Sequence, residues 1–258
     1  MNRTIFLAGA TGAIGRVLAP ILVAGGYRVF GSTRRADRVR ALERGGVRPV
    51  VVDVLDADAL AQAVESVRPD LVIHQLTDLP ATICPSTMTA AVRRNAALRI
   101  AGTRNLVAAA LRAGCRRLVA QSVAWVYREG PTPHREDDPL DEPAAGDRRT
   151  TLEGVRALES AVLETPGLQG AVLRYGRLHG PGTWHERPPE ELPLHVHAAA
   201  YAAFLAVENA AAGVYNVVED DPRVSNAKAR QDLQWRPEFR FDRTPAQARA
   251  VLEEWPTA

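Results

Sequence analysis

The sequence predicts an α/β fold built on a doubly wound parallel sheet. Short apolar runs alternate with segments whose apolar residues recur every three or four positions, which is the pattern of strands alternating with amphipathic helices. A parallel sheet needs such crossovers, and their right-handedness places helices on both of its faces. A glycine-rich turn directly after the first apolar run is a second, independent indication of this fold class.

The predicted elements follow one another regularly through the first two thirds of the chain. Asp56 is predicted to cap the third helix, because its carboxylate can accept a hydrogen bond from a free backbone N–H group. Strands are expected in the aliphatic runs at 4–8, 27–31, 50–52, 71–73, 117–121 and 171–174. Helices are expected where the apolar spacing is helical, at 14–24, 35–44, 56–67, 86–113 and 151–164.

Composition excludes several other classes of protein. The chain has 258 residues, 46% hydrophobic and 24% charged, so it can fold around a large core. The 32 basic and 30 acidic residues give a net charge of +2, which predicts no binding to nucleic acid. No apolar run approaches the roughly 20 residues of a membrane span, and no signal peptide is visible. Cys84 and Cys115 match no metal spacing and predict a reducing, cytoplasmic location.

Three glycines in the turn after the first strand predict a dinucleotide site. Gly9, Gly12 and Gly15 form the pattern G-x-x-G-x-x-G between a predicted strand and a predicted helix. Gly9 permits the tight turn, Gly12 lets a pyrophosphate approach the backbone, and Gly15 lets helix and strand pack closely. The free N–H groups at the start of the helix then favour the phosphates, and the alternative is a tight turn without a ligand. The other loop residues predicted to bind the cofactor are Thr11, Ala13 and Ile14.

The end of the second strand predicts which dinucleotide binds. An NAD site usually has an acid there for the ribose 2′-hydroxyl, but residues 31–35 are GSTRR and no acid precedes Asp37. A guanidinium binds a 2′-phosphate through two parallel hydrogen bonds, whereas a carboxylate would repel it. We therefore predict NADP(H), with Arg34 as the main contact and Thr33 and Arg35 beside it. The alternative is that Arg34 is a solvated surface arginine.

The C-terminal third is less regular and is expected to form a small cap. Without a linker that would separate independent domains, we expect one domain, with residues 1–175 as a dinucleotide-binding core and 176–258 mostly as a substrate-binding cap. Proline-rich loops are predicted at 128–149 and 181–193, a helix at 197–208 and a strand at 214–218.

Several segments together resemble one family, the extended or atypical short-chain dehydrogenase/reductases, also called the NAD-dependent epimerase/dehydratase family. The segments are the glycine loop at 9–15, Asp53-Val54, LRYGRLHGPG at 173–182, SNAKA at 225–229 and LQWRP at 233–237. The resemblance implies a Rossmann-type fold. It also implies that Asp53 meets the adenine amino group and that Val54 lies beside the ring. Further cofactor-binding positions that it implies are Gln75, Leu76, Thr77 and Asn95.

The resemblance also draws attention to residues that are missing. In that family a Ser or Thr, a Tyr and a Lys move the proton, and the Lys lowers the pKa of the Tyr and holds the nicotinamide ribose. This chain has a single lysine, Lys228, and contains no Tyr-x-x-x-Lys pattern. When the chain is matched to the family pattern, Val123 stands at the Ser/Thr position, Thr151 at the Tyr position and Val155 at the Lys position. The usual proton relay is therefore predicted to be absent.

Residues just past the fifth and sixth strands are candidates for the active site, because ligands of such sheets bind at the carboxyl ends of the strands. We predict Tyr127 as a replacement acid and Ser122 as a second catalytic residue; the alternatives are a structural tyrosine and a turn-capping serine. His195 and His197 lack a third ligand at motif spacing, so no metal is predicted. The predicted substrate pocket comprises Gln121, Trp125, Arg174, Tyr175, His179 and Trp184.

Three functions are compatible with a dinucleotide site that lacks the usual relay. The first is an NADP(H)-binding oxidoreductase or epimerase-like protein that acts on a small metabolite through a non-standard active site. The second is a non-redox isomerase, lyase or cyclase, and the third is a non-catalytic NADP-binding sensor. The resemblance also implies a homodimer that forms through the helices at 86–113 and 151–164.

Overall fold

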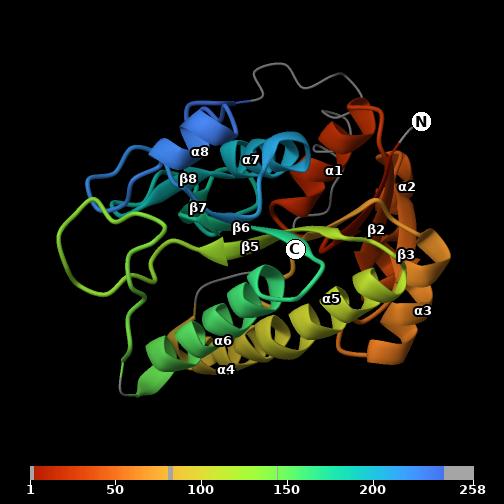
Figure 1. Cartoon of the computed structure of the whole chain (residues 1–258), viewed down its shortest axis with the longest axis horizontal. Coiled ribbons are helices and arrows are strands. Elements are labelled where there is room, and N and C mark those ends of the chain that lie inside the picture. Colours follow the sequence, from red (N-terminus) through yellow and green to blue (C-terminus); the bar gives the residue numbers. More distant parts are fainter. Residues whose placement is uncertain (1–2, 81–83, 144, 241–258) are drawn as a thin grey trace.

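The protein is built around one parallel sheet in its computed structural model, which describes residues 3–80, 84–143 and 145–240. Seven strands lie in the order β3-β2-β1-β4-β5-β6-β9, and all neighbours are parallel (Figure 1). The predicted doubly wound fold is confirmed, and its strand order reverses between β1 and β4. The strands are β1 (Thr4–Ala8), β2 (Arg28–Thr33), β3 (Arg48–Val51), β4 (Leu71–His74), β5 (Arg117–Val123), β6 (Gln169–Tyr175) and β9 (Gly213–Val217).

Helices cover both faces of this sheet. One face packs against α1, α2 and α7, and the other against α3, α5 and α6, with α4 lying on α6 (Figure 1). None of the described helices is long and apolar enough to cross a membrane. The helices are α1 (Gly15–Ala24), α2 (Val39–Arg44), α3 (Ala57–Val67), α4 (Pro85–Ala97), α5 (Thr103–Arg112), α6 (Gly146–Leu163), α7 (Val196–Asn209) and α8 (Ala227–Asp232).

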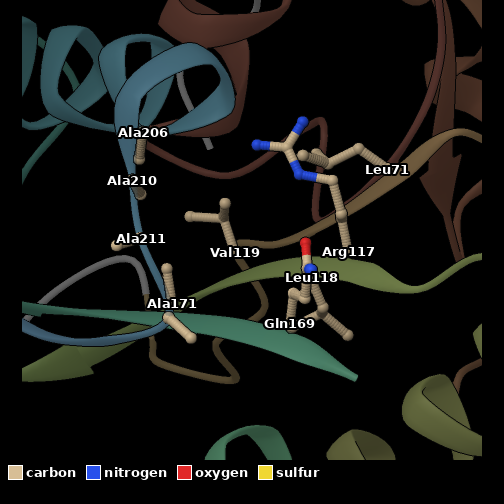
Figure 2. Close-up of a pocket in the computed structure, with 10 residues that line it drawn as sticks. Leu71, Arg117, Leu118, Val119, Gln169, Ala171, Ala206, Ala210 and Ala211 are labelled. Carbon is tan, nitrogen blue, oxygen red and sulfur yellow. The ribbon is translucent and has the colours of Figure 1, made fainter. Parts of the chain in front are cut away.

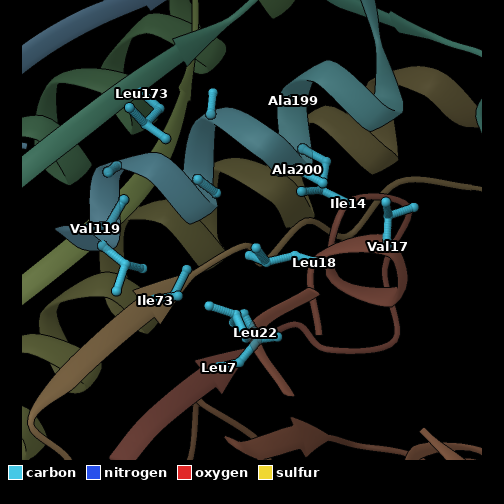
Figure 3. Packing of buried hydrophobic residues seen from close by; sticks show 14 of the residues in the cluster. Leu7, Ile14, Val17, Leu18, Leu22, Ile73, Val119, Leu173, Ala199 and Ala200 are labelled. Atoms are coloured by element: carbon cyan, nitrogen blue, oxygen red, sulfur yellow. The ribbon is translucent and has the colours of Figure 1, made fainter. Parts of the chain in front are cut away.

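The strands are apolar on both sides because both sides are covered. Ile5 and Leu7 of β1 belong to one core cluster, while Phe6 of the same strand belongs to the other. In the first cluster, leucines of α1 and the alanines of α7 face the strand residues (Figure 3). The small side chains at Ala199 and Ala200 are fully buried there. The continuous apolar runs of the sequence therefore mark strands buried on both faces.

Some element boundaries differ from those predicted. Asp56 caps α3 as predicted, since its carboxylate accepts from the Ala59 N–H at 3.0 Å. The single helix predicted at 86–113 is instead α4 and α5 joined by a π-helical turn, Leu98–Gly102. Helix α6 begins at Gly146 rather than at Thr151. Residues 146–149 are exposed, so the first turn of the helix lacks the spaced apolar residues by which a helix is recognised in a sequence.

The segment 176–258, predicted mostly as a cap, contributes to both the sheet and its helical layers. Strand β9 pairs with β6 at the edge of the sheet, and α7 packs on α1. A separate two-stranded sheet is formed by β7 (Arg177–His179) and β8 (Pro193–His195). Residues 241–258 lie outside the described part of the chain. The pieces next to the carboxyl edge are thus β7, β8 and the loops around them.

Candidate functional site

The glycine loop after β1 contains three glycines, and the packing of the protein requires glycine at two of these positions but not at the third. Gly9 has a φ of +86°, and a Cβ there would lie 2.4 Å from the Gln75 carbonyl oxygen. A Cβ at Gly15 would lie 2.1 Å from the Gly9 oxygen. At Gly12 the nearest atom would be 3.4 Å away, an ordinary contact, and φ is not positive. A glycine at 12 is therefore explained by a ligand that approaches the backbone, as a pyrophosphate would.

The start of α1 offers free backbone donors beside that glycine. The helix has no side-chain cap at Ile14, and the N–H groups of Arg16 and Val17 donate to the Gly12 and Ile14 carbonyls. The backbone donors left for an anion, among the described residues, are the N–H groups of residues 13–15 just before them. The side chain of Ile14 is 4% exposed and packs in the core, while Thr11 and Ala13 are half-buried. Ile14 can therefore meet a phosphate only through its backbone.

Three loops meet over the carboxyl edge of the sheet. Arg16, in the first turn of α1, donates to the Pro181 carbonyl at 3.0 Å and lies where a Cβ on Gly182 would be. Trp184 donates from its indole N–H to the Pro80 carbonyl at 2.7 Å. Burial, and then the charge of Arg38, lower the pKa of Arg16, so an anion placed nearby would be favourable. Arg16 was not predicted, although it directly follows the last glycine of the loop.

The residues predicted at the adenosine end lie at the ends of β2 and β3. The side chain of Arg34 is half-exposed, and its Nη2 atom lies 3.6 Å from Oδ1 of Asp78. Arg35 donates to Asp37 at 2.6 Å, and its backbone N–H donates to the Thr33 hydroxyl at 3.1 Å. Arg34 is therefore the more available of the two guanidinium groups.

Asp53 and Val54 form the turn that follows β3. Asp53 accepts from the Leu55 N–H at 3.0 Å, and Val54 is buried, with its carbonyl accepting from Asn105. The two residues thus have fixed backbones, as a site for a flat ring needs.

The exit of β4 places one polar side chain without a full set of partners. Gln75 is 3% exposed, its Nε2 donates to the Tyr175 hydroxyl at 3.4 Å, and its Oε1 has no partner. Leu76 is half-buried and Thr77 is exposed. Asn95 of α4 is buried and accepts from the Asp78 N–H at 3.1 Å. Gln75 is therefore left with an unpaired, fully buried acceptor at the switch point of the sheet.

A buried ionic network engages both predicted catalytic hydroxyls. Glu159 of α6 accepts from Nε and Nη2 of Arg174 at 3.0 and 2.7 Å and from the Ser122 hydroxyl at 2.7 Å. Tyr127 accepts from Nη1 of Arg174 at 2.9 Å and donates to Asn216 at 2.6 Å. Burial raises the pKa of Tyr127, which makes its proton harder to remove. The predicted acid, the predicted serine and Arg174 therefore lie together, held by one another.

The remaining predicted pocket residues do not converge on one point. Gln121 is 9% exposed near the end of β5. Trp125 lies under the guanidinium of Arg177, whose Cζ is 5.1 Å from the ring centre. His179 is 3.4 Å from Glu219, and its ring meets that of His195 at 5.1 Å. No group of three or more potential metal ligands occurs within the described ranges.

The cavity drawn in Figure 2 lies away from all of these residues. Its volume is about 300 Å³, and its lining includes Leu71, Arg117 and Gln169, the first residues of β4, β5 and β6. Alanines at the end of α7 and just beyond it complete the wall. The cavity is therefore at the amino edge of the sheet, whereas the glycine loop is at the carboxyl edge. It is not part of the candidate site.

Comparisons with known proteins agree with this geometry. A model of the NAD dependent epimerase/dehydratase family matches residues 5–220. A protein from a Streptomyces species, named 3-diazoavenalumate denitrifying reductase, is 38% identical over 257 residues, covering 91% of this chain and 80% of its own length.

Solved structures share the fold at lower sequence identity. The UDP-glucose 4-epimerase of Thermotoga maritima with UDP-glucose has a TM-score of 0.73 at 17% identity, covering 97% of each chain. The Thermus thermophilus UDP-glucose 4-epimerase, in complex with NAD, has a TM-score of 0.72 at 20% identity, covering 98% of each. At such identities the likeness concerns the fold alone.

Proposed function

Because the chain belongs to the NAD-dependent epimerase/dehydratase family, we propose that it is an NADP(H)-dependent reductase whose acceptor takes up a hydride but no proton. The observation that carries this proposal is the state of the two candidate hydroxyls. Ser122 donates to Glu159 and Tyr127 donates to Asn216, both inside a buried network. The only lysine, Lys228, donates to the Val214 carbonyl at 2.7 Å, in the strand at the far edge of the sheet. A reaction that needs no general acid fits such a site.

The residues at the carboxyl edge fit a nicotinamide dinucleotide. Gly12 leaves room for the pyrophosphate, and the N–H groups of residues 13–15, at the entry to α1, are donors that it can use. We propose that Asp53 and Val54 hold the adenine and that Gln75, Leu76, Thr77 and Asn95 line the path toward the nicotinamide. Arg34 makes the phosphorylated form the expected one, because a guanidinium favours a 2′-phosphate.

The acceptor class that we propose is an aryl diazonium compound, on the model of the relative whose name describes a denitrifying reductase of a diazo acid. The glycine loop and Arg34 would hold NADPH, which when bound would supply a hydride to the ring carbon. The bond from that carbon to nitrogen would break with its electron pair leaving in N₂, so that arene, N₂ and NADP⁺ would form without a proton. Trp184, whose loop meets the Pro80 loop over the carboxyl edge, is proposed to offer a flat apolar surface to such a ring. Tyr127 and Ser122 would then hold the Arg174–Glu159 pair in place rather than move a proton.

Isotope labelling tests this function directly. With an aryl diazonium carboxylate, 4-deuterated NADPH in H₂O is expected to give product with one deuterium at the former C–N carbon. Unlabelled NADPH in D₂O is expected to give none. Reactions without protein correct for direct reduction by the cofactor. Turnover that does not need cofactor would support the non-redox alternative, and label from solvent would show that a proton is required; either result overturns the proposal. Tight cofactor binding without any turnover would support the sensor.

Replacing Arg34 tests the choice of cofactor. Arg34→Ala is expected to weaken NADPH binding by about 10- to 100-fold, the value of a charge-assisted hydrogen bond, and to leave NADH binding unchanged. Calorimetric titration with both cofactors measures the two affinities. Arg40→Ala, an exposed arginine on α2, is the matched control and should change neither. Equal affinity of the native protein for NADPH and NADH would contradict the prediction.

A homodimer through the helices at 86–113, which are α4 and α5, and through α6 stays a prediction, as does a cytoplasmic location. Both α4 and α5 pack on α6, and the outward residues of these helices would have to form the interface. Light scattering that finds only monomer would remove the dimer.

A further inference from the structure

Arg99 is a buried cation that no part of the described chain neutralises by contact. It is 5% exposed, and within residues 3–80, 84–143 and 145–240 no group hydrogen-bonds or ion-pairs with its guanidinium. Arg174, buried to the same degree, donates three hydrogen bonds to Glu159 and Tyr127. Charges taken out of water are normally paired, because desolvation of an isolated ion is costly. Arg99 therefore requires an explanation that the fold does not supply.

The position of Arg99 is set by an irregular turn at the carboxyl edge of the sheet. It lies in the π-helical turn Leu98–Gly102, between α4 and α5, which packs against α6. One turn later, Thr103 shares a hydrogen bond of 2.9 Å with His74, the last residue of β4. Single π-helical turns inside helices are frequently found at functional sites. Arg99 therefore lies beside the ends of the strands where the ligands of this fold bind.

The nearest counter-charge is already used. Burial lowers the pKa of Arg99 to about 10, and the charge of Glu159 only partly opposes this. Glu159 itself accepts from Arg174 and from Ser122. Two buried guanidinium groups thus share one carboxylate, and the region has an excess positive charge. An anion that enters from outside would balance it.

The guanidinium is within reach of such an anion. Among the described residues, the fully buried side-chain polar atoms without a partner are Gln75 Oε1 and Asn216 Nδ2. The guanidinium nitrogens of Arg99 also lack partners within the described chain. They are not fully buried like the two atoms above, so they retain some contact with solvent. The guanidinium therefore keeps a small surface that a ligand group can contact.

We propose that Arg99 binds a carboxylate group of the substrate. A carboxylate matches the planar guanidinium with two parallel hydrogen bonds, and it supplies the missing charge. Other arginines along this edge have partners: Arg16 contacts Pro181 and Arg34 lies near Asp78. The proposal rests on the proposed function, since it names the anionic group of that substrate. The carboxylate site differs from the proposed function in that it concerns only binding of the substrate and not the reaction.

Binding of a matched pair of probes tests the site without turnover. We use cinnamate, an aryl carboxylate, and cinnamamide, its neutral analogue, titrated into the NADP⁺-loaded full chain. The native protein is expected to bind cinnamate at least about 10-fold more tightly than cinnamamide, as a charge-assisted pair implies. Arg99→Met is expected to abolish that preference without changing NADP⁺ affinity. Arg104→Met, an exposed arginine on α5, is the control and should keep it.

A second measurement separates a binding role from a structural one. In the absence of ligand, Arg99→Met is expected to raise Tm by several degrees, because it removes an unpaired buried charge. Arg99→Lys keeps the charge and should retain part of the preference for cinnamate. An equal affinity of the native protein for the two probes, or a preference that survives in Arg99→Met, overturns the proposal. So does a lower Tm or a failure to fold, because Arg99 would then be structural. If labelling fails while the cinnamate preference holds, the reaction is wrong and the site is right.

Discussion

Replacing Glu159 with glutamine is expected to lower the free energy of unfolding by about 3–5 kcal/mol, the usual cost of removing one partner from a buried ion pair. The carboxylate is 6% exposed and lies 2.7 Å from Nη2 of Arg174. Glutamine keeps the shape of the side chain but not its charge. The variant would therefore leave Arg174 and Arg99 as two buried cations with no opposing charge. Urea unfolding at pH 7 measures the loss.

The same helix supplies a matched control. Glu153 pairs with Arg149 at 2.8 Å, but both side chains are more than half exposed. Glu153→Gln should cost less than about 1 kcal/mol, because exposed pairs are screened by water. The double variant Glu159→Gln/Arg174→Met should recover much of the lost stability, since it removes the charge left behind. Equal losses for Glu159→Gln and Glu153→Gln would show that burial of the network does not matter.

Acid is expected to destabilise the fold between about pH 6.5 and pH 4, by about 3 kcal/mol through His74 alone. Burial lowers the pKa of His74 to about 4. Because the pKa in the folded state is below that of the unfolded chain, the contribution is complete above pH 6.5. It is lost as pH falls toward 4, where the unfolded state binds the additional proton. Burial also lowers the pKa of His195 to about 3 and that of His197 to about 4. Protonation of these two side chains in acid therefore also destabilises the folded state.

The geometry around His74 explains why it stays neutral. Its Nδ1 accepts from the Leu76 N–H at 3.3 Å, so its Nε2 carries the proton and donates to Thr103. A second proton on Nδ1 would face that N–H group. Unfolding curves measured from pH 7 to pH 4 should show a steeper fall for the native protein than for His74→Asn, which has no proton to gain. Parallel curves would contradict the assignment.

Much of the frame was predictable because it depends on local patterns. The alternation of strands and helices gave the sheet, and Asp56 was identified as the cap that the structure shows. The spacing of Gly9, Gly12 and Gly15 located the loop correctly between β1 and α1. Helix α6 was placed too late, since its first turn is polar and exposed. The π-turn before α5 was not predicted. One additional residue in a turn rotates the helix face that follows, but the segments on either side still have helical spacing of their own.

The amino-acid sequence by itself determined the order of the strands and helices, the glycine turn and the lack of a Tyr-x-x-x-Lys pair, because each of these is a matter of residue type at short spacing. Only the tertiary structure decided what the candidate side chains touch. Tyr127 meets Asn216 across 89 positions and Ser122 meets Glu159 across 37, so no local pattern connects them. Whether a buried arginine has a partner depends on which distant carboxylate the fold brings near. Arg174 has one, whereas Arg99 has none among the residues that the structure describes. Charge balance in a protein interior is a property of three-dimensional packing, and burial sets its energy.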